Sequence, residues 1–340
     1  RAGLNREPYV SLVVLALTLQ LAAIYLFNAV QKHGPTWDDG HAVHYVLWQN
    51  RIATALGGWL RMREPQWFSP LLTGATLWAE GLVALLVLSP FRQRAARTVA
   101  FVIALLLHGG IALTIDVWPH SLSIVVFGML LLPPELLDQA ANRVTWLRWL
   151  GHDADRSPCG DSAVVWPVML REGAVMIIAV AVLLQISRDN PAVPEILRAP
   201  GLGPLEPIIT YPRLFQRWSM FEEAPITDGT LVVDARTADG RHLDPLTNRA
   251  PDFEAAWHGP WRLSPLYCDY YLKIQRPHYR AHLAGLERYL QGWHRSDGRP
   301  DTDRLVSFEV YWVSHVAPAP GSTTPTAIER RLLLRSTGKH

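Results

Sequence analysis

Apolar residues form long runs in the first half of the chain, up to about Ser187, and alternate with polar residues after it. The first run, residues 9–30, would be about 33 Å long as a helix, enough to cross a bilayer. Four more runs follow, over residues 71–88, 98–118, 121–132 and 163–186. Because residues 121–132 are few and end at Pro133-Pro134, a tilted, interfacial or re-entrant segment stays open there. The pattern predicts a transmembrane domain of about five spans in residues 1–187.

Residues 188–210 are rich in Pro and Gly, which predicts an ordered, non-helical linker. The following part, residues 211–340, has the composition of a water-soluble domain. It predicts a β-hairpin, a helix broken near Pro277 and two C-terminal strands, over residues 229–246, 267–293, 304–315 and 328–336. The predicted fold class is an α-helical transmembrane bundle followed by a small, β-rich α+β domain.

The charged residues bear on the class of partner and on the orientation in the membrane. The chain is 49% hydrophobic and only 18% charged, with a net charge of +2 and no basic patch interleaved with aromatics, which excludes a nucleic-acid partner. If all five runs cross, the arginines of the short connections fall on one side, which is then cytoplasmic. These residues are Arg1, Arg6, Arg92, Arg94, Arg97, Arg143 and Arg148. The linker and residues 211–340 are therefore predicted to be extracytoplasmic.

This orientation separates the two cysteines, Cys159 and Cys268, so no intrachain disulfide is expected. The chain begins at Arg1 without an initiating Met, and the first run is too long for a signal-peptide core. We therefore expect the natural N-terminus to lie upstream.

Ionisable residues at membrane depth are expensive and mark functional candidates, here Glu80 and His108. The alternative for each is a hydrogen bond that ties two helices together. Lys32 follows the first run, where a lysine can also serve as a snorkelling anchor at the interface.

The segment after Lys32 is polar and aromatic. His41 and His44 would share one helix face, but no third strong ligand completes a metal pattern, so no metal site is predicted. Trp37 and Trp48 suit an interfacial helix on the outer leaflet. From the residues alone we predict an outer-face polar site, and nothing indicates its chemistry.

Three motifs add a resemblance. They are LQLAAIYLFNAVQKHGPTWDDGHAVHYVL, LLHGGIALTIDVWPHSLSIVVFGMLLLP, and QRWSMFEEAP with DGTLVVDARTADGR. The first two resemble segments of vitamin K-dependent γ-glutamyl carboxylase, and the third is similar to the bacterial HTTM group of carboxylase-like membrane proteins. Taken together, the three motifs extend the resemblance over most of the chain, up to about Pro245.

The resemblance implies a carbon–carbon lyase chemistry. Lys32 matches the carboxylase's base, which deprotonates a reduced vitamin K-type quinone. Oxygenation of that quinol then yields a base strong enough to remove a γ-proton from a polypeptide glutamate. His108 matches an assisting histidine, while Trp37, Glu80, His41 and His44 are expected near the quinol or substrate. A membrane site suits this role, because a lysine near its usual pKa of about 10.4 is protonated and desolvation frees the amine.

The implied function is thus a quinol-dependent oxygenase or carboxylase, with menaquinone hydroquinone as the expected co-substrate and membrane lipid as its surroundings. Part of the carboxylase has no counterpart here, including helices before the first run and a propeptide-recognising region. The alternative is a non-catalytic membrane scaffold or biogenesis factor whose outer domain binds a partner.

Overall fold

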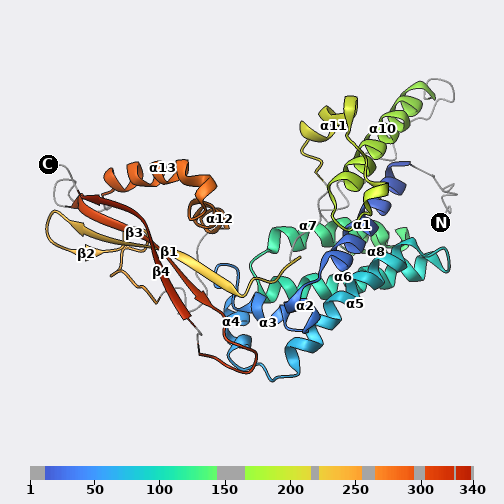
Figure 1. Cartoon of the computed structure of the whole chain (residues 1–340). Helices are drawn as coiled ribbons and strands as arrows, with labels where there is room; N and C mark the ends of the chain where they lie inside the picture. The colour runs from blue at the N-terminus through green and yellow to red at the C-terminus, as the bar shows by residue number, and fades with distance from the viewer. Residues whose placement is uncertain are drawn as a thin grey trace. The chain divides into compact units, whose positions relative to one another are not determined.

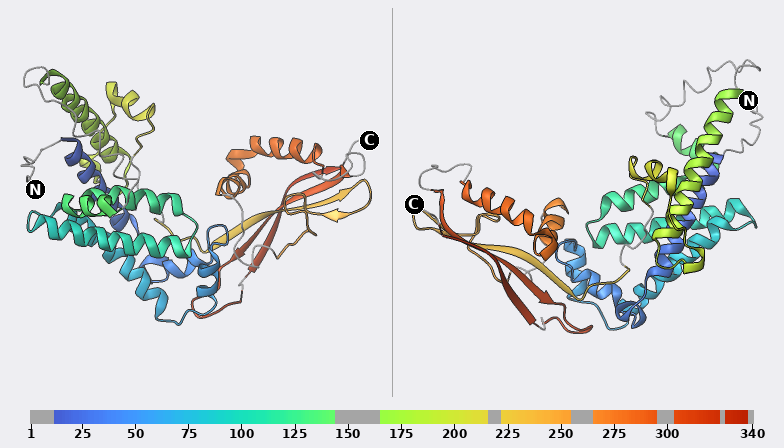
Figure 2. Two further views of the ribbon diagram at one scale, coloured as in Figure 1. Left: turned by 180° about the vertical axis from the view of Figure 1, so that it is seen from behind. Right: turned by 45° about the horizontal axis from the view of Figure 1, so that its top comes forward.

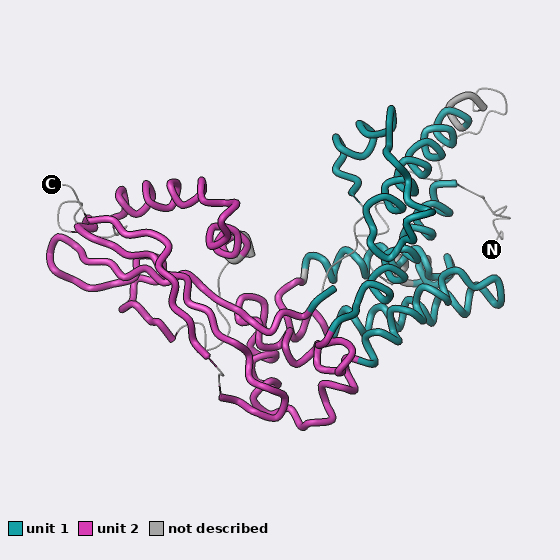
Figure 3. The backbone as a smooth tube through the Cα atoms, viewed as in Figure 1, with its two compact units in different colours: residues 1–34, 74–110, 119–223 teal, residues 35–73, 111–118, 224–340 magenta. Residues whose placement is uncertain are grey.

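The computed structural model describes residues 12–143, 165–215, 222–254, 265–294, 303–324 and 327–337. Within these residues the chain is mostly helical, with a four-stranded antiparallel sheet in its C-terminal part (Figure 1). It divides into two compact units, shown in Figure 3. Unit 1 comprises residues 1–34, 74–110 and 119–223, and unit 2 comprises residues 35–73, 111–118 and 224–340. Unit 2 therefore joins the C-terminal domain with two earlier segments, which differs from the contiguous division that the sequence suggested.

Four of the described helices are long and apolar enough to cross a membrane. They are α1 (Leu12–Gln31), α5 (Phe68–Leu88), α6 (Gln93–Thr114) and α10 (Val165–Asp189). Each contains at least the 20 or so residues that a bilayer core of about 30 Å requires. Large apolar side chains stay exposed on them, among them Trp78, Leu85, Leu106 and Leu170. Exposed apolar surface of this extent is typical of helices whose surroundings are lipid.

The predicted segment at residues 121–132 falls in α7 (Trp118–Gly128) and the single 3₁₀ turn η1 (Met129–Leu131), a shorter apolar helix. It ends where Pro133 and Pro134 remove backbone donors, and α8 (Pro134–Arg143) follows. The structure thus supplies four helices of spanning length for five predicted runs, and leaves α7 as the short one.

The apolar core of unit 1 joins α1, α5, α6 and α7. Leu21 and Tyr25 of α1 pack against Val83 of α5 in this cluster. Small residues of α5 and α6, including Ala84, Ala100 and Ala104, are almost fully buried in this cluster. This packing fixes the register of the polar residues carried by the same helices.

Unit 2 begins with three short helices, α2 (Pro35–Asp38), α3 (Ala42–Leu47) and α4 (Ala55–Arg61). Its sheet has the order β2-β1-β3-β4, with β1 (Thr227–Thr237), β2 (His242–Leu243), β3 (Leu305–Val316) and β4 (Ala327–Thr337). The predicted hairpin is confirmed, since β1 pairs with β2 across a turn in which Gly240 has a φ of +87°. The two predicted C-terminal strands are confirmed as β3 and β4, which pair with each other.

One face of this sheet is covered by helices (Figure 2). The predicted broken helix is confirmed as α12 (Pro265–Ile274), the 3₁₀ turn η5 (Pro277–Tyr279) and α13 (Arg280–Gln291). Ile274 and Leu290 are buried against Leu231 and Val310 of the sheet. Alternate residues of β1 and β3 thus face the helices, which is the period-2 pattern that the sequence displays.

The linker is more structured than predicted. It contains the 3₁₀ turns η3 (Glu195–Leu197) and η4 (Gly203–Leu205) and the short helix α11 (Glu206–Thr210), so the non-helical prediction is wrong. Ala181 of α10 packs with Leu202 and Ile209, and this small apolar cluster lets the linker fold back on the helix. Residues 216–221, which contain the whole W-x-M-F motif, lie outside the described residues, as does Cys159.

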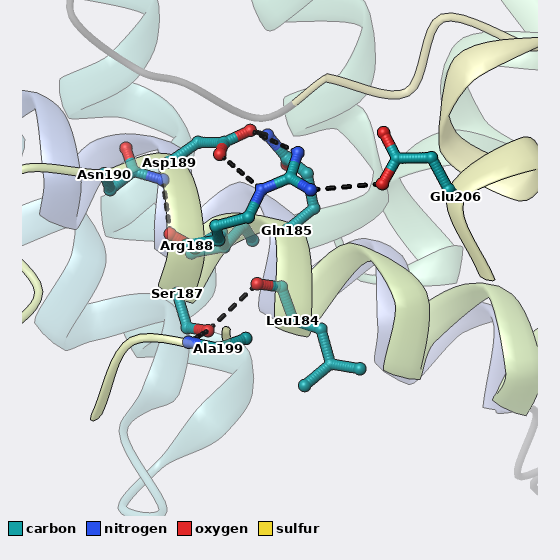
Figure 4. Close-up of polar contacts among 9 residues, drawn as sticks. Leu184, Gln185, Ser187, Arg188, Asp189, Asn190, Ala199 and Glu206 are labelled. Carbon is teal, nitrogen blue, oxygen red and sulfur yellow. Dashed lines mark hydrogen bonds and ion pairs between the residues drawn. The ribbon is translucent and has the colours of Figure 1, made fainter. Parts of the chain in front are cut away.

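Polar contacts hold the end of α10, as Figure 4 shows. Arg188 pairs with Asp189 and, at 3.1 Å, with Glu206 of α11, and the Ala199 amide donates to the Ser187 hydroxyl. Asn190 lies just beyond the helix, and its Nδ2 donates to the Ile186 carbonyl.

The Asn190 amide also accepts a buried hydrogen bond of 2.9 Å from Nε2 of Gln31, at the end of α1. We expect Asn190→Ala to destabilise unit 1 by about 1–3 kcal/mol, because Gln31 would keep a buried donor without this acceptor. The matched control is Arg188→Ala, which removes more exposed ion pairs and should cost at most about 1 kcal/mol. Thermal unfolding of both variants in detergent micelles measures the difference. Equal losses would contradict the importance of the buried amide pair.

Candidate functional site

A line of polar residues runs along one face of α1 into its C-terminal end. Tyr25, Asn28 and Lys32 are spaced three and four residues apart, which places them on the same side of a helix. All three are buried among the residues of unit 1. A polar stripe on an otherwise apolar helix needs partners on neighbouring helices, because an unpaired polar group at membrane depth is costly.

Lys32 finds its partner on α5. Its Nζ pairs with both carboxylate oxygens of Glu80, and the two side chains are only 5% and 7% exposed. The snorkelling alternative for Lys32 is therefore wrong, since a snorkelling amine would reach out of the protein. The sequence selected both residues, and the structure joins them in one buried ion pair.

His108 of α6 lies next to the same stripe. Its ring centroid is 6.0 Å from that of Tyr25 and 5.8 Å from that of His120 on α7, both in edge-on arrangements. Electrostatic interactions connect Lys32 with both histidines and Glu80 with Tyr25. We call these residues, Tyr25, Asn28, Lys32, Glu80, His108 and His120, the unit 1 polar cluster.

Several buried atoms of this region lack a hydrogen-bond partner within the described part of the chain. They are the Tyr25 hydroxyl, Asn28 Oδ1, His108 Nδ1 and the hydroxyl of the neighbouring Ser121. Native proteins rarely leave such groups unsatisfied, since each costs about 1–3 kcal/mol. The cluster thus holds buried donors and acceptors that have no partner among the described residues, close to an amine and a carboxylate that can exchange a proton.

The remaining predicted site residues belong to unit 2. Trp37 of α2 is 6% exposed and Trp48, just after α3, is 1% exposed, so the prediction that they face the outer leaflet is wrong. The chain turns at Gly40, whose φ is +74°, a conformation that favours glycine. His41 precedes α3 without a capping hydrogen bond from its side chain.

His44 is fully buried and both of its ring nitrogens have partners. Nδ1 contacts the Glu64 carboxylate, and Nε2 lies 2.8 Å from the carbonyl oxygen of Pro318, beyond the end of β3. The contact with Pro318 ties segment 35–73 to the sheet domain, and the contact with Glu64 stays within the segment. In the described residues, no group of three or more His, Cys, Asp or Glu side chains is arranged to hold a metal ion.

Unit 2 also contains a polar cavity of about 380 Å³ at one end of its sheet. Its lining includes Trp312 and Asp228 together with three arginines, Arg51, Arg276 and Arg331, and Glu329. Asp228 is buried, with Arg51 Nε 3.9 Å from its Oδ1. The guanidinium groups outnumber the carboxylates, which favours an anionic ligand.

Asp228 is directly opposite His315 in the β1–β3 register, and burial shifts the pKa of each. Desolvation raises the pKa of Asp228 to about 6, against an opposing contribution from Arg51. Desolvation, aided by Arg61, lowers the pKa of His315 to about 4. Both groups are therefore held towards their neutral forms.

These shifts predict opposing pH effects on the stability of unit 2. The Asp228 contribution is complete below its ordinary pKa of 3.8 and is lost as pH rises through about 6. The His315 contribution is complete above 6.5 and is lost as pH falls through about 4. Between these pH values the stability contributions of Asp228 and His315 change in opposite directions, each by about 3 kcal/mol, so they offset each other.

We expect Asp228→Asn to lose stability on acidification from pH 6.5 to 4, and His315→Gln to gain it. Hydrogen-exchange protection of the β1 and β3 amides, corrected for intrinsic exchange, measures both. The wild type should change less than either variant. Parallel pH profiles for all three proteins would contradict the assignment.

The sequence missed His120 and Ser121 as members of the site region, because His120 falls between two predicted runs and Ser121 begins the run over residues 121–132. The signal was present: two polar residues follow Pro119 inside the HSLS stretch, in the same quoted motif as His108. Their proximity to α1 depends on how α7 packs in the unit 1 core, which no spacing rule provides.

Searches with protein-family models, among curated proteins and among solved structures found no match to this chain.

Proposed function

We propose that this chain is an integral membrane protein with its C-terminal domain on the extracytoplasmic side. The exposed apolar helices support insertion, and contacts within unit 2 support the topology. Gln49 Nε2 donates to the Pro225 carbonyl at 2.8 Å, and His44 lies at the same distance from Pro318. Segments that contact each other outside the membrane lie on one side of it. The chain therefore crosses an even number of times between residues 73 and 224.

Three long helices, α5, α6 and α10, make an odd number of crossings, so α7 with η1 supplies the fourth. These 14 residues (Trp118–Leu131) span about 20 Å as a helix, less than the bilayer core, which local thinning accommodates. With α1, the total is five. Arg92, Arg94 and Arg97 then lie opposite the C-terminal domain, in agreement with the positive-inside rule.

We further propose that the unit 1 polar cluster is the active site of a quinol-dependent oxygenase or carboxylase of the γ-glutamyl carboxylase-like type. The observation that carries this proposal is the buried Lys32–Glu80 pair beside polar atoms that have no partner in the described chain. A bound quinol would supply the reducing equivalents and, with oxygen, the strong base for proton removal from a glutamate side chain.

The residues of the cluster have separable roles. Lys32 would pass its own proton to Glu80, which leaves the pair neutral, and its free amine would then accept the proton of a quinol hydroxyl, with the quinolate balancing the charge on the amine. The Tyr25 hydroxyl and His108 Nδ1 are buried polar atoms that can hydrogen-bond the two oxygens of a quinol. The apolar side chains around them, among them Leu21 and Val83, suit the ring and exclude water.

The test is an assay of quinone epoxide in membranes that contain the protein, with reduced menaquinone and oxygen. The variant Lys32→Met/Glu80→Gln removes both charges together, so no unpaired charge is left buried. We expect epoxide from the wild type and a rate at least about 100-fold lower from the variant, the usual contribution of a positioned base.

The matched control is Lys273→Met/Asp269→Asn, which removes an exposed lysine–carboxylate pair on α12 and should leave the rate unchanged. An absence of epoxide with wild type and control alike, both folded, would refute the oxygenase proposal.

The second candidate is a non-catalytic scaffold whose outer domain binds a partner, and the cavity of unit 2 favours it. Three arginines at its lining fit an acidic polypeptide segment. Fluorescence anisotropy with a labelled oligoglutamate peptide at low ionic strength tests this function. Binding that Arg276→Glu abolishes would support the scaffold, and equal binding by wild type and variant would count against it.

A further inference from the structure

Unit 2 exposes an apolar surface on α4 and on the loop that follows it. Leu56, Trp59, Met62 and Trp67 are 41%, 51%, 49% and 63% exposed. The guanidinium of Arg63 lies over the Trp59 ring, with its Cζ 5.0 Å from the ring centroid. We call these five residues the α4 surface. Such a patch, with two indole rings and one cation, has no cover within the described chain.

Two attachments place the α4 surface at the ends of proposed membrane helices. The first is the chain itself, since α5 begins at Phe68, directly after Trp67, and consecutive Cα atoms are only about 3.8 Å apart. Any membrane that contains α5 therefore has its boundary close to Trp67.

The second attachment is a set of hydrogen bonds to the end of α6. The Thr54 amide donates to the Thr114 carbonyl at 3.0 Å, and the Thr54 hydroxyl donates to the Leu113 carbonyl at 2.6 Å. An added Cβ at Gly57 would lie 2.2 Å from the Thr114 oxygen, so the two backbones are in direct contact there. The inner side of α4 thus holds the end of α6, and its other side carries Leu56 and Trp59.

We infer that the α4 surface lies in the headgroup region of the bilayer, and that its partner is the lipid surface itself. This inference rests on the proposed crossing of α5 and α6. Tryptophan is enriched at this depth because its ring is apolar and its N–H can hydrogen-bond, and an arginine beside it can pair with lipid phosphate. Trp59 and Trp67 thus take the role that the sequence suggested for Trp37 and Trp48.

The occupant is a bilayer and not a protein, because the surface joins two spanning helices at their ends. A soluble protein bound to the α4 surface would have to displace the lipid headgroups at the ends of the same two helices. The α4 surface also fixes segment 35–73, and with it the sheet contacts of His44, at the membrane boundary.

Spin labels on the whole chain test the inference in nanodiscs of phosphatidylcholine and phosphatidylglycerol. In a Cys159→Ser/Cys268→Ser background, single labels are placed by Leu56→Cys and Met62→Cys, which retain both tryptophans. Collision rates with oxygen and with a water-soluble nickel chelate report depth. Leu85→Cys, on the exposed face of α5, reports the crossing, and Ala284→Cys, exposed on α13, reports the aqueous phase.

We expect the labels at Leu56 and Met62 to collide with oxygen more than the Ala284 label and with the chelate more than the Leu85 label. Chelate access at both sites equal to that at Ala284, with Leu85 protected, would overturn the α4 inference and leave the crossing intact. A Leu85 label as accessible to the chelate as Ala284 would overturn both.

Discussion

Lys32→Met alone is expected to destabilise unit 1 by about 3–5 kcal/mol, because it leaves the Glu80 carboxylate buried without its counter-charge. Glu80→Gln alone should have a similar cost for the opposite reason, since the amine of Lys32 would then be buried without the Glu80 carboxylate. Such losses approach the total stability of many proteins, so reduced yield of either single variant is part of the expected result.

The double variant Lys32→Met/Glu80→Gln should recover most of this loss. Replacement of a buried ion pair by neutral groups of similar volume is often nearly neutral, so the coupling between the two sites should be at least about 2 kcal/mol. Thermal unfolding of the four proteins in one detergent measures the cycle. The exposed Lys273–Asp269 pair provides the comparison, with an expected coupling below about 1 kcal/mol.

This cycle also separates stability from chemistry. A double variant that is folded but makes no epoxide would place the defect in proton transfer. Additive single effects would mean that the buried pair does not operate as a unit, and would remove the main support for the proposed active site.

The second large effect is expected at Gly57→Ala. The new Cβ would lie 2.2 Å from the Thr114 carbonyl oxygen and 3.2 Å from its carbon, distances that no rotation of a side chain can relieve. Either α4 or the end of α6 must move, at a cost of about 3 kcal/mol or more. The hydrogen bonds of Thr54 to Leu113 and Thr114 should weaken together with this contact.

The control is Gly285→Ala in α13, where an added Cβ meets nothing within 4 Å. This variant should gain up to about 1 kcal/mol from the higher helix propensity of Ala. Hydrogen exchange of the Thr54 amide, compared between the two variants, measures the local effect. Unchanged protection in Gly57→Ala would show that the close approach of α4 and α6 does not contribute to stability.

Apolar periodicity was sufficient for most secondary structure. The long runs became α1, α5, α6 and α10 because a lipid-facing helix needs a continuous apolar stretch, and that stretch is visible in one dimension. Alternation and turn residues likewise predicted β1 to β4, and Pro277 marked the break between α12 and α13.

Exposure was harder to predict. Trp37 and Trp48 were assigned to the interface, whereas both are buried and Trp59 and Trp67 are exposed. All four are tryptophans of segment 35–73, so composition cannot separate them. Their burial depends instead on the sheet domain, which lies nearly 200 residues later in the sequence and belongs with segment 35–73 to unit 2.

The sequence by itself determined the helices, the strands and the ionisable residues worth testing, because each depends on local pattern or on the cost of a charge in an apolar run. Only the tertiary structure decided which of those residues meet. It paired Lys32 with Glu80, brought His120 to His108, and assigned Trp37, His41 and His44 to the other unit. Such contacts depend on helix packing and on long-range strand pairing, whose register is set by side chains far apart in the chain.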